Sequence, residues 1–130
     1  MKNIFKKGDQ KVYQFKVKES DQAAFHGEIL HSVCSTFALA REIEWSSRLF
    51  FIEMRDDDEE GVGTMLTIQH RSPAFVDETL TITATVESIK KNELICSIDV
   101  SVNDRQIAVG STGQKMLKKE KLNKLFTRQG

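Results

Sequence analysis

Apolar and polar residues alternate strictly over residues 11–18, so that three apolar side chains share one face and Lys and Gln side chains share the other. A period of two residues is typical of a strand with one buried face. The same alternation recurs several times in the second half of the chain. Five strands are therefore predicted, over residues 11–18, 64–70, 79–89, 94–102 and 105–117.

Between Ser32 and Met54 the apolar positions recur at steps of three and four residues, and neither Pro nor Gly interrupts them. This period predicts one long helix with an apolar stripe on one side. Residues 19–32 show no regular period and are expected to form a loop. The predicted stripe consists of Val33, Phe37, Ala40, Ile43 or Glu44, Ser47 and Phe51.

Two charged runs flank the predicted elements. Six acids and one Arg over residues 53–60 belong in solvent, as a loop after the helix. Residues 115–128 hold six basic residues and one Glu. The apolar residues among them are expected to dock this tail as a short helix, and they are Leu117, Leu122, Leu125 and Phe126.

Tight turns at residues 90–93 and 103–104 predict an antiparallel sheet. The single helix must bury its stripe against that sheet, so the expected architecture is an α+β hotdog fold. In this fold a sheet of five to six strands wraps around one long central helix, and one domain spans residues 1–130. An ordinary α+β sandwich satisfies the same layer rules. Unpaired edge strands further predict association with a second copy.

Composition narrows the class of protein. A chain of 130 residues with 39% hydrophobic and 29% charged residues is typical of one globular domain. The formal net charge is +0, which argues against a nucleic-acid partner. No apolar run approaches the ~20 residues of a membrane span, and the N-terminal residues lack the apolar centre of a signal peptide. A cytoplasmic protein without a membrane partner is expected.

Cysteine and histidine usage excludes several chemistries. Cys34 and Cys96 stand alone rather than in paired spacing, and two buried free thiols are expected. The three His residues follow no metal-ligand spacing, so no metal is predicted. Neither a glycine-rich phosphate loop nor a GxSxG elbow is present. No cofactor is therefore expected.

Three residues remain as candidates for chemistry. Glu44 lies on the apolar stripe, where a carboxylate is costly unless it is hydrogen-bonded or catalytic, although at the stripe's margin it would reach solvent. His70 shares a phase with Leu66 and Ile68 and is expected to face the helix, as a core histidine or a functional one. Thr36 could cap the helix. Two titratable groups that converge in an apolar interior are a stronger signal than either alone.

The spacing of these residues resembles a known family. Ser35-Thr36-Phe37 followed by Glu44-Trp45, Gly63-Thr64 followed by His70 and Pro73, and Gly110-Ser111 are similar to the hotdog thioesterases of the fluoroacetyl-CoA thioesterase type. The likeness covers about residues 10–127. It implies that Thr36, Glu44 and His70 are catalytic and that Gly63 lies near the acyl thioester. It also implies a homodimer with active sites at the subunit interface.

The sequence departs from the family pattern at two places. Gly27 and Leu30 stand where the fluoroacetate enzyme has aromatic lid residues, so the lid and the acyl selectivity are expected to differ. Gln114 and Met116 replace a His and an Arg, which implies the loss of one charged contact to substrate.

The resulting hypothesis is hydrolysis of a short or small acyl-CoA thioester to the free acid and CoA. Glu44 would activate water or Thr36, while His70 and a backbone N–H near Gly63 would stabilise the oxyanion. The main alternative is a non-catalytic module that binds acyl-CoA or fatty acyl groups. A hydratase would need an Asp and a His about five residues apart on a loop and a helix, whereas Asp21, His26 and His31 all lie in the predicted loop.

Overall fold

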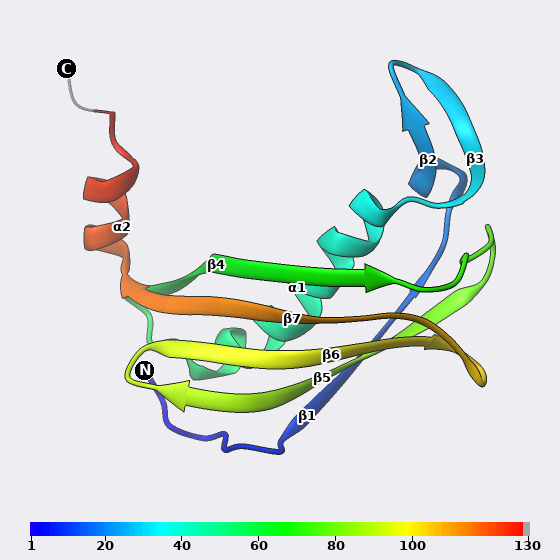
Figure 1. Cartoon of the computed structure of the whole chain (residues 1–130). Coiled ribbons are helices and arrows are strands. Elements are labelled where there is room, and N and C mark those ends of the chain that lie inside the picture. Colours follow the sequence, from blue (N-terminus) through cyan, green and yellow to red (C-terminus); the bar gives the residue numbers. More distant parts are fainter. Residues whose placement is uncertain (129–130) are drawn as a thin grey trace.

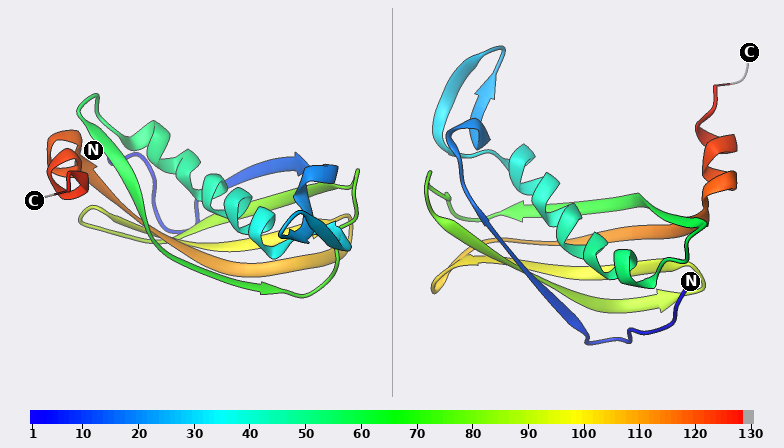
Figure 2. Two further views of the ribbon diagram at one scale, coloured as in Figure 1. Left: turned by 90° about the horizontal axis from the view of Figure 1, so that it is seen from above. Right: turned by 180° about the vertical axis from the view of Figure 1, so that it is seen from behind.

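The computed structural model describes residues 1–128. Five antiparallel strands form one curved sheet in the order β1-β5-β6-β7-β4, and the long helix α1 lies across its concave side (Figures 1 and 2). This is the predicted hotdog arrangement. The elements are β1 (Gln10–Lys16), β2 (Gln22–Phe25), β3 (Glu28–Cys34), α1 (Thr36–Met54), β4 (Glu59–His70), β5 (Thr79–Lys90), β6 (Glu93–Val102), β7 (Arg105–Lys118) and α2 (Lys119–Phe126).

Helix α1 begins four residues later than predicted. The Ser35 hydroxyl accepts a hydrogen bond from the Ala38 N–H at 2.9 Å and so caps the helix. The side that packs on the sheet also differs from the predicted stripe, because Phe37 is 85% exposed. The buried side consists of Ala38, Leu39, Ile43, Ser46, Ser47, Phe50, Phe51 and Met54.

Residues 22–34 form a hairpin, where a loop was predicted. Strands β2 and β3 form a separate two-stranded sheet that stands away from the main sheet (Figure 1). His26 and Gly27 both have positive φ, of 53° and 81°, which is typical of a two-residue hairpin turn. The hairpin is attached to the body through the Cys34 N–H, which donates to the Ala74 carbonyl at 2.8 Å.

Strand β4 includes part of the acidic run, since Glu59 and Glu60 are already extended. Its pairing with β7 slips by one residue between Gly63 and Met65, so Thr64 is the extra residue of a β-bulge. Before the bulge, odd-numbered residues face α1. After it, the even-numbered residues do.

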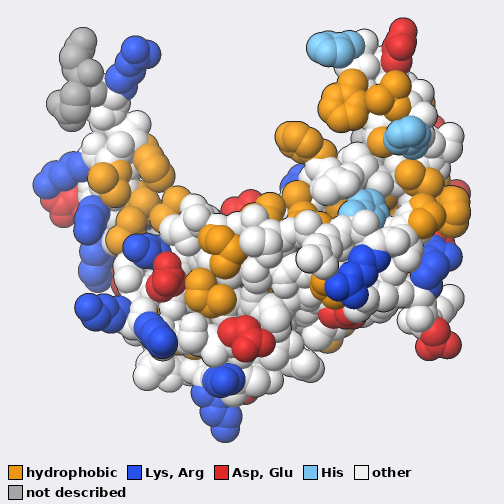
Figure 3. Space-filling model, in the orientation of Figure 1, with side chains coloured by type: hydrophobic (Ala, Val, Ile, Leu, Met, Phe, Trp, Pro, Cys, Tyr) orange, Lys and Arg blue, Asp and Glu red, His pale blue; other side chains and the backbone are white. Residues whose placement is uncertain are grey.

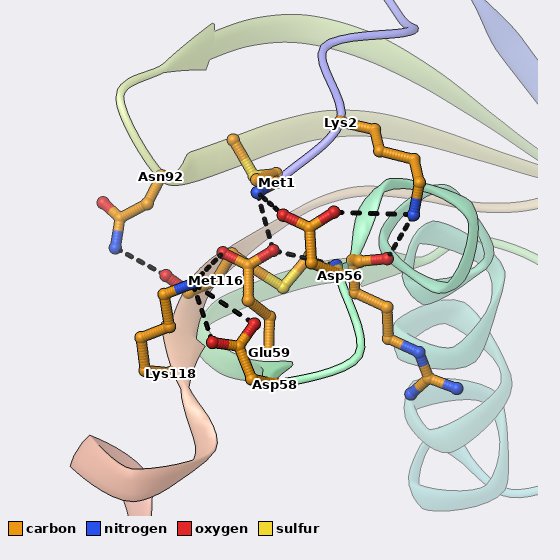
Figure 4. Close-up of polar contacts among 9 residues, drawn as sticks. Met1, Lys2, Asp56, Asp58, Glu59, Asn92, Met116 and Lys118 are labelled. Carbon is orange, nitrogen blue, oxygen red and sulfur yellow. Dashed lines mark hydrogen bonds and ion pairs between the residues drawn. The ribbon is translucent and has the colours of Figure 1, made fainter.

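Polar contacts hold the chain's first residue and the end of β7 to the start of β4 (Figure 4). The Met1 ammonium lies 2.6 Å from Asp56 and 2.7 Å from Glu59. Lys118 pairs with Asp58 at 3.0 Å and lowers the pKa of that carboxyl by donating a hydrogen bond to it.

The tail forms the short helix α2, but it does not dock as predicted. Leu122 is buried, whereas Leu125 and Phe126 remain exposed. Within residues 1–128, no helix has the length and apolar character required to cross a membrane.

Candidate functional site

Thr36 and His70 meet where the start of α1 crosses the end of β4. The Thr36 hydroxyl lies 3.0 Å from His70 Nδ1, within hydrogen-bond distance. Because the bulge brings the even-numbered residues of β4 toward α1, His70 faces the helix as its phase with Ile68 predicted. Nε2 of the same ring is buried and has no partner among the described residues. The imidazole is thus held at one nitrogen only.

Glu44 lies farther along the same helix, about 12 Å from Thr36 along the axis. In one chain it is exposed rather than interior, and within residues 1–128 its carboxylate makes no hydrogen bond. The carboxylate lies against Gly63 of β4, because a Cβ built on that glycine would collide with Glu44 Oε1. Gly63 therefore leaves the space that the Glu44 carboxylate occupies.

A cleft of about 650 Å³ runs between Thr36 and Glu44. The walls between Thr36 and Glu44 are mainly apolar, and a second cavity of about 580 Å³ adjoins Thr36 beneath the β2–β3 hairpin. The first cleft is lined by Thr36, Phe37, Ala40, Arg41, Glu44 and Leu66.

Gln114 fixes the helical turn that carries Glu44. It is buried on β7 directly opposite Gly63, and its amide donates to Ser47 Oγ at 2.9 Å and to the Glu44 carbonyl at 3.4 Å. Gln114 and Met116 are both buried beneath α1, so neither side chain lines the cleft where a substrate would bind. The sequence interpretation missed this positioning role, although the alternation of Thr112, Gln114 and Met116 was a signal that all three face inward.

The site combines an unpartnered carboxylate, a hydroxyl–imidazole pair and an apolar channel between them. Such a set can remove a proton from water, donate a proton to a leaving group and hold an acyl chain. Within the described residues there is no cluster of His, Cys, Asp or Glu that could hold a metal ion.

Gly63→Ala is a direct test of the contact between β4 and Glu44. The added methyl group collides only with the end of an exposed side chain, so the midpoint of thermal unfolding should move by less than about 3 °C. The displaced carboxylate should lower kcat at least tenfold. Gly61→Ala is the contrasting variant, because its Cβ would lie 2.6 Å from the buried Phe51 ring and should destabilise the fold. An unchanged kcat in Gly63→Ala would contradict this role of the glycine.

Comparison with known proteins identifies the family and the fold. A family model described as fluoroacetyl-CoA-specific thioesterase matches residues 17–120. No curated protein matches by sequence.

Among solved structures, a thioesterase superfamily member from Thermus thermophilus is 22% identical, with a TM-score of 0.90 over 95% of this chain and 92% of that one. A variant of the fluoroacetyl-CoA-specific thioesterase in complex with fluoroacetate and CoA is 18% identical, with a TM-score of 0.85 over 92% and 100%. A hot-dog-like protein from Thermanaerovibrio acidaminovorans is 19% identical, with a TM-score of 0.86 over 96% of each chain. The chain therefore belongs to the fluoroacetyl-CoA-specific thioesterase family and is an acyl-CoA thioester hydrolase.

Proposed function

We propose that the enzyme releases a short or small acyl group from CoA, with Thr36, Glu44 and His70 as its catalytic residues and Gly63 beside the thioester. The observation that carries this assignment is the placement of the Thr36–His70 pair and the Glu44–Gly63 contact along one apolar cleft. The apolar walls of the cleft suit an acyl group.

In the proposed reaction, Glu44 takes a proton from water as the water oxygen attacks the thioester carbonyl carbon. The negative charge that develops on the carbonyl oxygen needs hydrogen-bond donors, for which the Thr36–His70 pair and a backbone N–H near Gly63 are the candidates. When the C–S bond breaks, the imidazole protonates the departing thiolate. Glu44 then releases to solvent the proton that it took from water, and the imidazole takes up a proton from solvent, so both groups return to their starting states.

Release of free thiol, followed with a thiol-reactive dye, tests the substrate class. Short, branched, aromatic and long acyl-CoA esters should be compared by kcat/KM. Short and small acyl groups should give the highest values, whereas a maximum at long chains would contradict the assignment.

The 3.0 Å contact between Thr36 and His70 also fits a nucleophile and its base. Attack by water and attack by the Thr36 hydroxyl therefore have to be distinguished by experiment. With water as nucleophile, rapid mixing should show no burst of thiol and Thr36→Val should keep measurable turnover. Mass spectrometry of the quenched enzyme should find no acyl adduct. A burst together with an acylated Thr36 would assign the attack to the threonine.

We further propose that the enzyme is a homodimer joined along β4. Both β4 and β1 are edge strands, but β1 carries Lys11 and Lys16, and lysines protect an edge from pairing. The run 63–67 of β4 is exposed and uncharged. The outer side of α1 also presents Phe37, which lines the cleft together with Leu66 of this edge. Pairing of two β4 strands would cover these apolar side chains and enclose the cleft.

A cytoplasmic location is proposed from the two cysteines. Both are free and buried, as predicted, and burial raises the pKa of Cys34 to about 11 and that of Cys96 to about 12. Thiols in this state are inert and suit a reducing compartment.

A further inference from the structure

Two arms of the chain rise beyond the free edge of β4. Helix α2 stands at the strand's beginning and the β2–β3 hairpin at its end, and Figure 3 shows the hollow between them. Each arm leaves apolar residues exposed in one chain. Leu125 is 61% and Phe126 70% exposed on α2, while Phe25, Ile29 and Leu30 are exposed on the hairpin.

Helix α2 needs a surface to pack against. It has only eight residues, and isolated helices below about 12 residues are marginal in water. Leu122, Leu125 and Phe126 follow a helical period and share one side, yet Leu122 alone is buried. The other two residues are exposed on an arm that stands beyond the edge of the sheet, beside the space that a second copy would occupy (Figure 1).

Symmetry identifies what would fill that space. In a two-fold antiparallel pairing, the beginning of one β4 lies beside the end of the other. The α2 arm of each chain then comes to the hairpin arm of its partner, and the same contact forms twice. Within one chain the two arms are separated by the length of β4 and do not meet (Figures 1 and 2).

The charges of the two arms are complementary. Residues 118–128 carry five basic residues and one Glu, whereas residues 19–34 carry three acids and neither Lys nor Arg. Asp21 is already paired with Arg41 at 3.0 Å, which leaves Glu19 and Glu28 exposed on the hairpin side. On α2, Lys119 and Lys121 are exposed. Opposite charges around an apolar centre are typical of a specific interface.

We propose that in the homodimer each α2 packs against the partner's β2–β3 hairpin, with Leu125 and Phe126 on Phe25, Ile29 and Leu30. This inference rests on the proposed dimer. The hairpin leads directly into Ser35 and Thr36 and roofs the 580 Å³ cavity beside them. The α2 helix of one subunit therefore holds in place the hairpin that covers the 580 Å³ cavity of the other subunit.

Hydrogen exchange tests the contact in the full-length protein. Phe126→Glu should leave the dimer intact but raise the exchange rate of amides in residues 22–34 at least tenfold. Lys124→Gln is the matched control, because it changes the charge of α2 by the same amount on the opposite side of the helix and should leave the hairpin protected. Equal hairpin exchange in the wild type and Phe126→Glu would overturn the proposal.

A cross-link tests whether the contact joins two chains. Phe126→Cys and Ile29→Cys subunits, refolded together and oxidised, should give a disulfide-linked dimer, whereas either variant alone should not. The native cysteines are buried and do not compete. Absence of the mixed link from a protein that sediments as a dimer would overturn the arm contact alone. A monomeric wild type would overturn the dimer as well, and binding of α2 to anionic vesicles with no effect on the hairpin would assign the helix to a membrane surface instead.

Discussion

Replacing Glu44 with glutamine should lower kcat by about 10²- to 10⁴-fold, the range that a positioned general base contributes. The substitution keeps the shape of the side chain and removes only its ability to accept a proton from water. Because Glu44 is exposed and its carboxylate makes no hydrogen bond within residues 1–128, the free energy of unfolding should change little. The measurement is thiol release at saturating acyl-CoA, together with KM.

Glu53→Gln is the control for Glu44→Gln. Glu53 is an exposed carboxylate on the same helix, where it pairs with Lys11, and loss of a surface pair has a small effect. Its kcat should stay within about twofold of the wild type. Turnover at the wild-type rate in Glu44→Gln would remove the carboxylate from the mechanism, whatever the role of the Thr36–His70 pair.

Met65→Lys should weaken the dimer by about 100-fold or more. Met65 lies at the middle of the exposed run 63–67, so in a two-fold pairing it comes next to the partner's Met65. Two lysines brought together there repel each other, and like charges across an interface cost several kcal/mol. Since each 1.4 kcal/mol is a tenfold change in Kd, a 100-fold loss is a conservative expectation. Analytical ultracentrifugation over a range of protein concentrations measures it.

Activity should follow the dimer in Met65→Lys. At low protein concentration kcat/KM should fall with the dimer fraction, and it should recover as concentration rises. That recovery separates loss of the interface from local damage to the cleft. Val12→Lys is the matched control, because Val12 is 61% exposed on the other edge strand and its substitution should leave both dimer and activity unchanged. A Met65→Lys protein that remains a dimer would show that the copies meet elsewhere.

The main sheet was predictable because its strands bury one face and therefore alternate. The β2–β3 hairpin was not predictable, because it stands apart from the core. Its exposed apolar residues do not alternate with polar ones, since Ile29 and Leu30 are adjacent. Without one buried face a strand carries no period of two. The two-residue turn at His26 and Gly27 was the remaining signal.

The candidate site was predictable in part. The phase of His70 with Ile68 correctly placed the imidazole toward the helix. Helical spacing could not tell which side of α1 packs on the sheet, because Phe37, Ala40 and Glu44 follow the same steps as Leu39 and Ile43. The first set lies on the outer side of the helix, so Glu44 is exposed in one chain. The positioning role of Gln114 could not be predicted, because it depends on a contact across 70 residues of sequence.

The irregular pairing at Thr64 has an evolutionary consequence. A relative that lost this single residue would keep the pairing of every later residue of the strand with β7, because the bulge adds one residue to β4 without changing the partners of Met65 to His70. His70 would still face Thr36, although it would stand one position closer to Gly63 along the chain. An alignment of the family therefore needs a one-residue gap here, and the equivalent imidazole is identified by its pairing opposite Ala108 rather than by its spacing from the glycine.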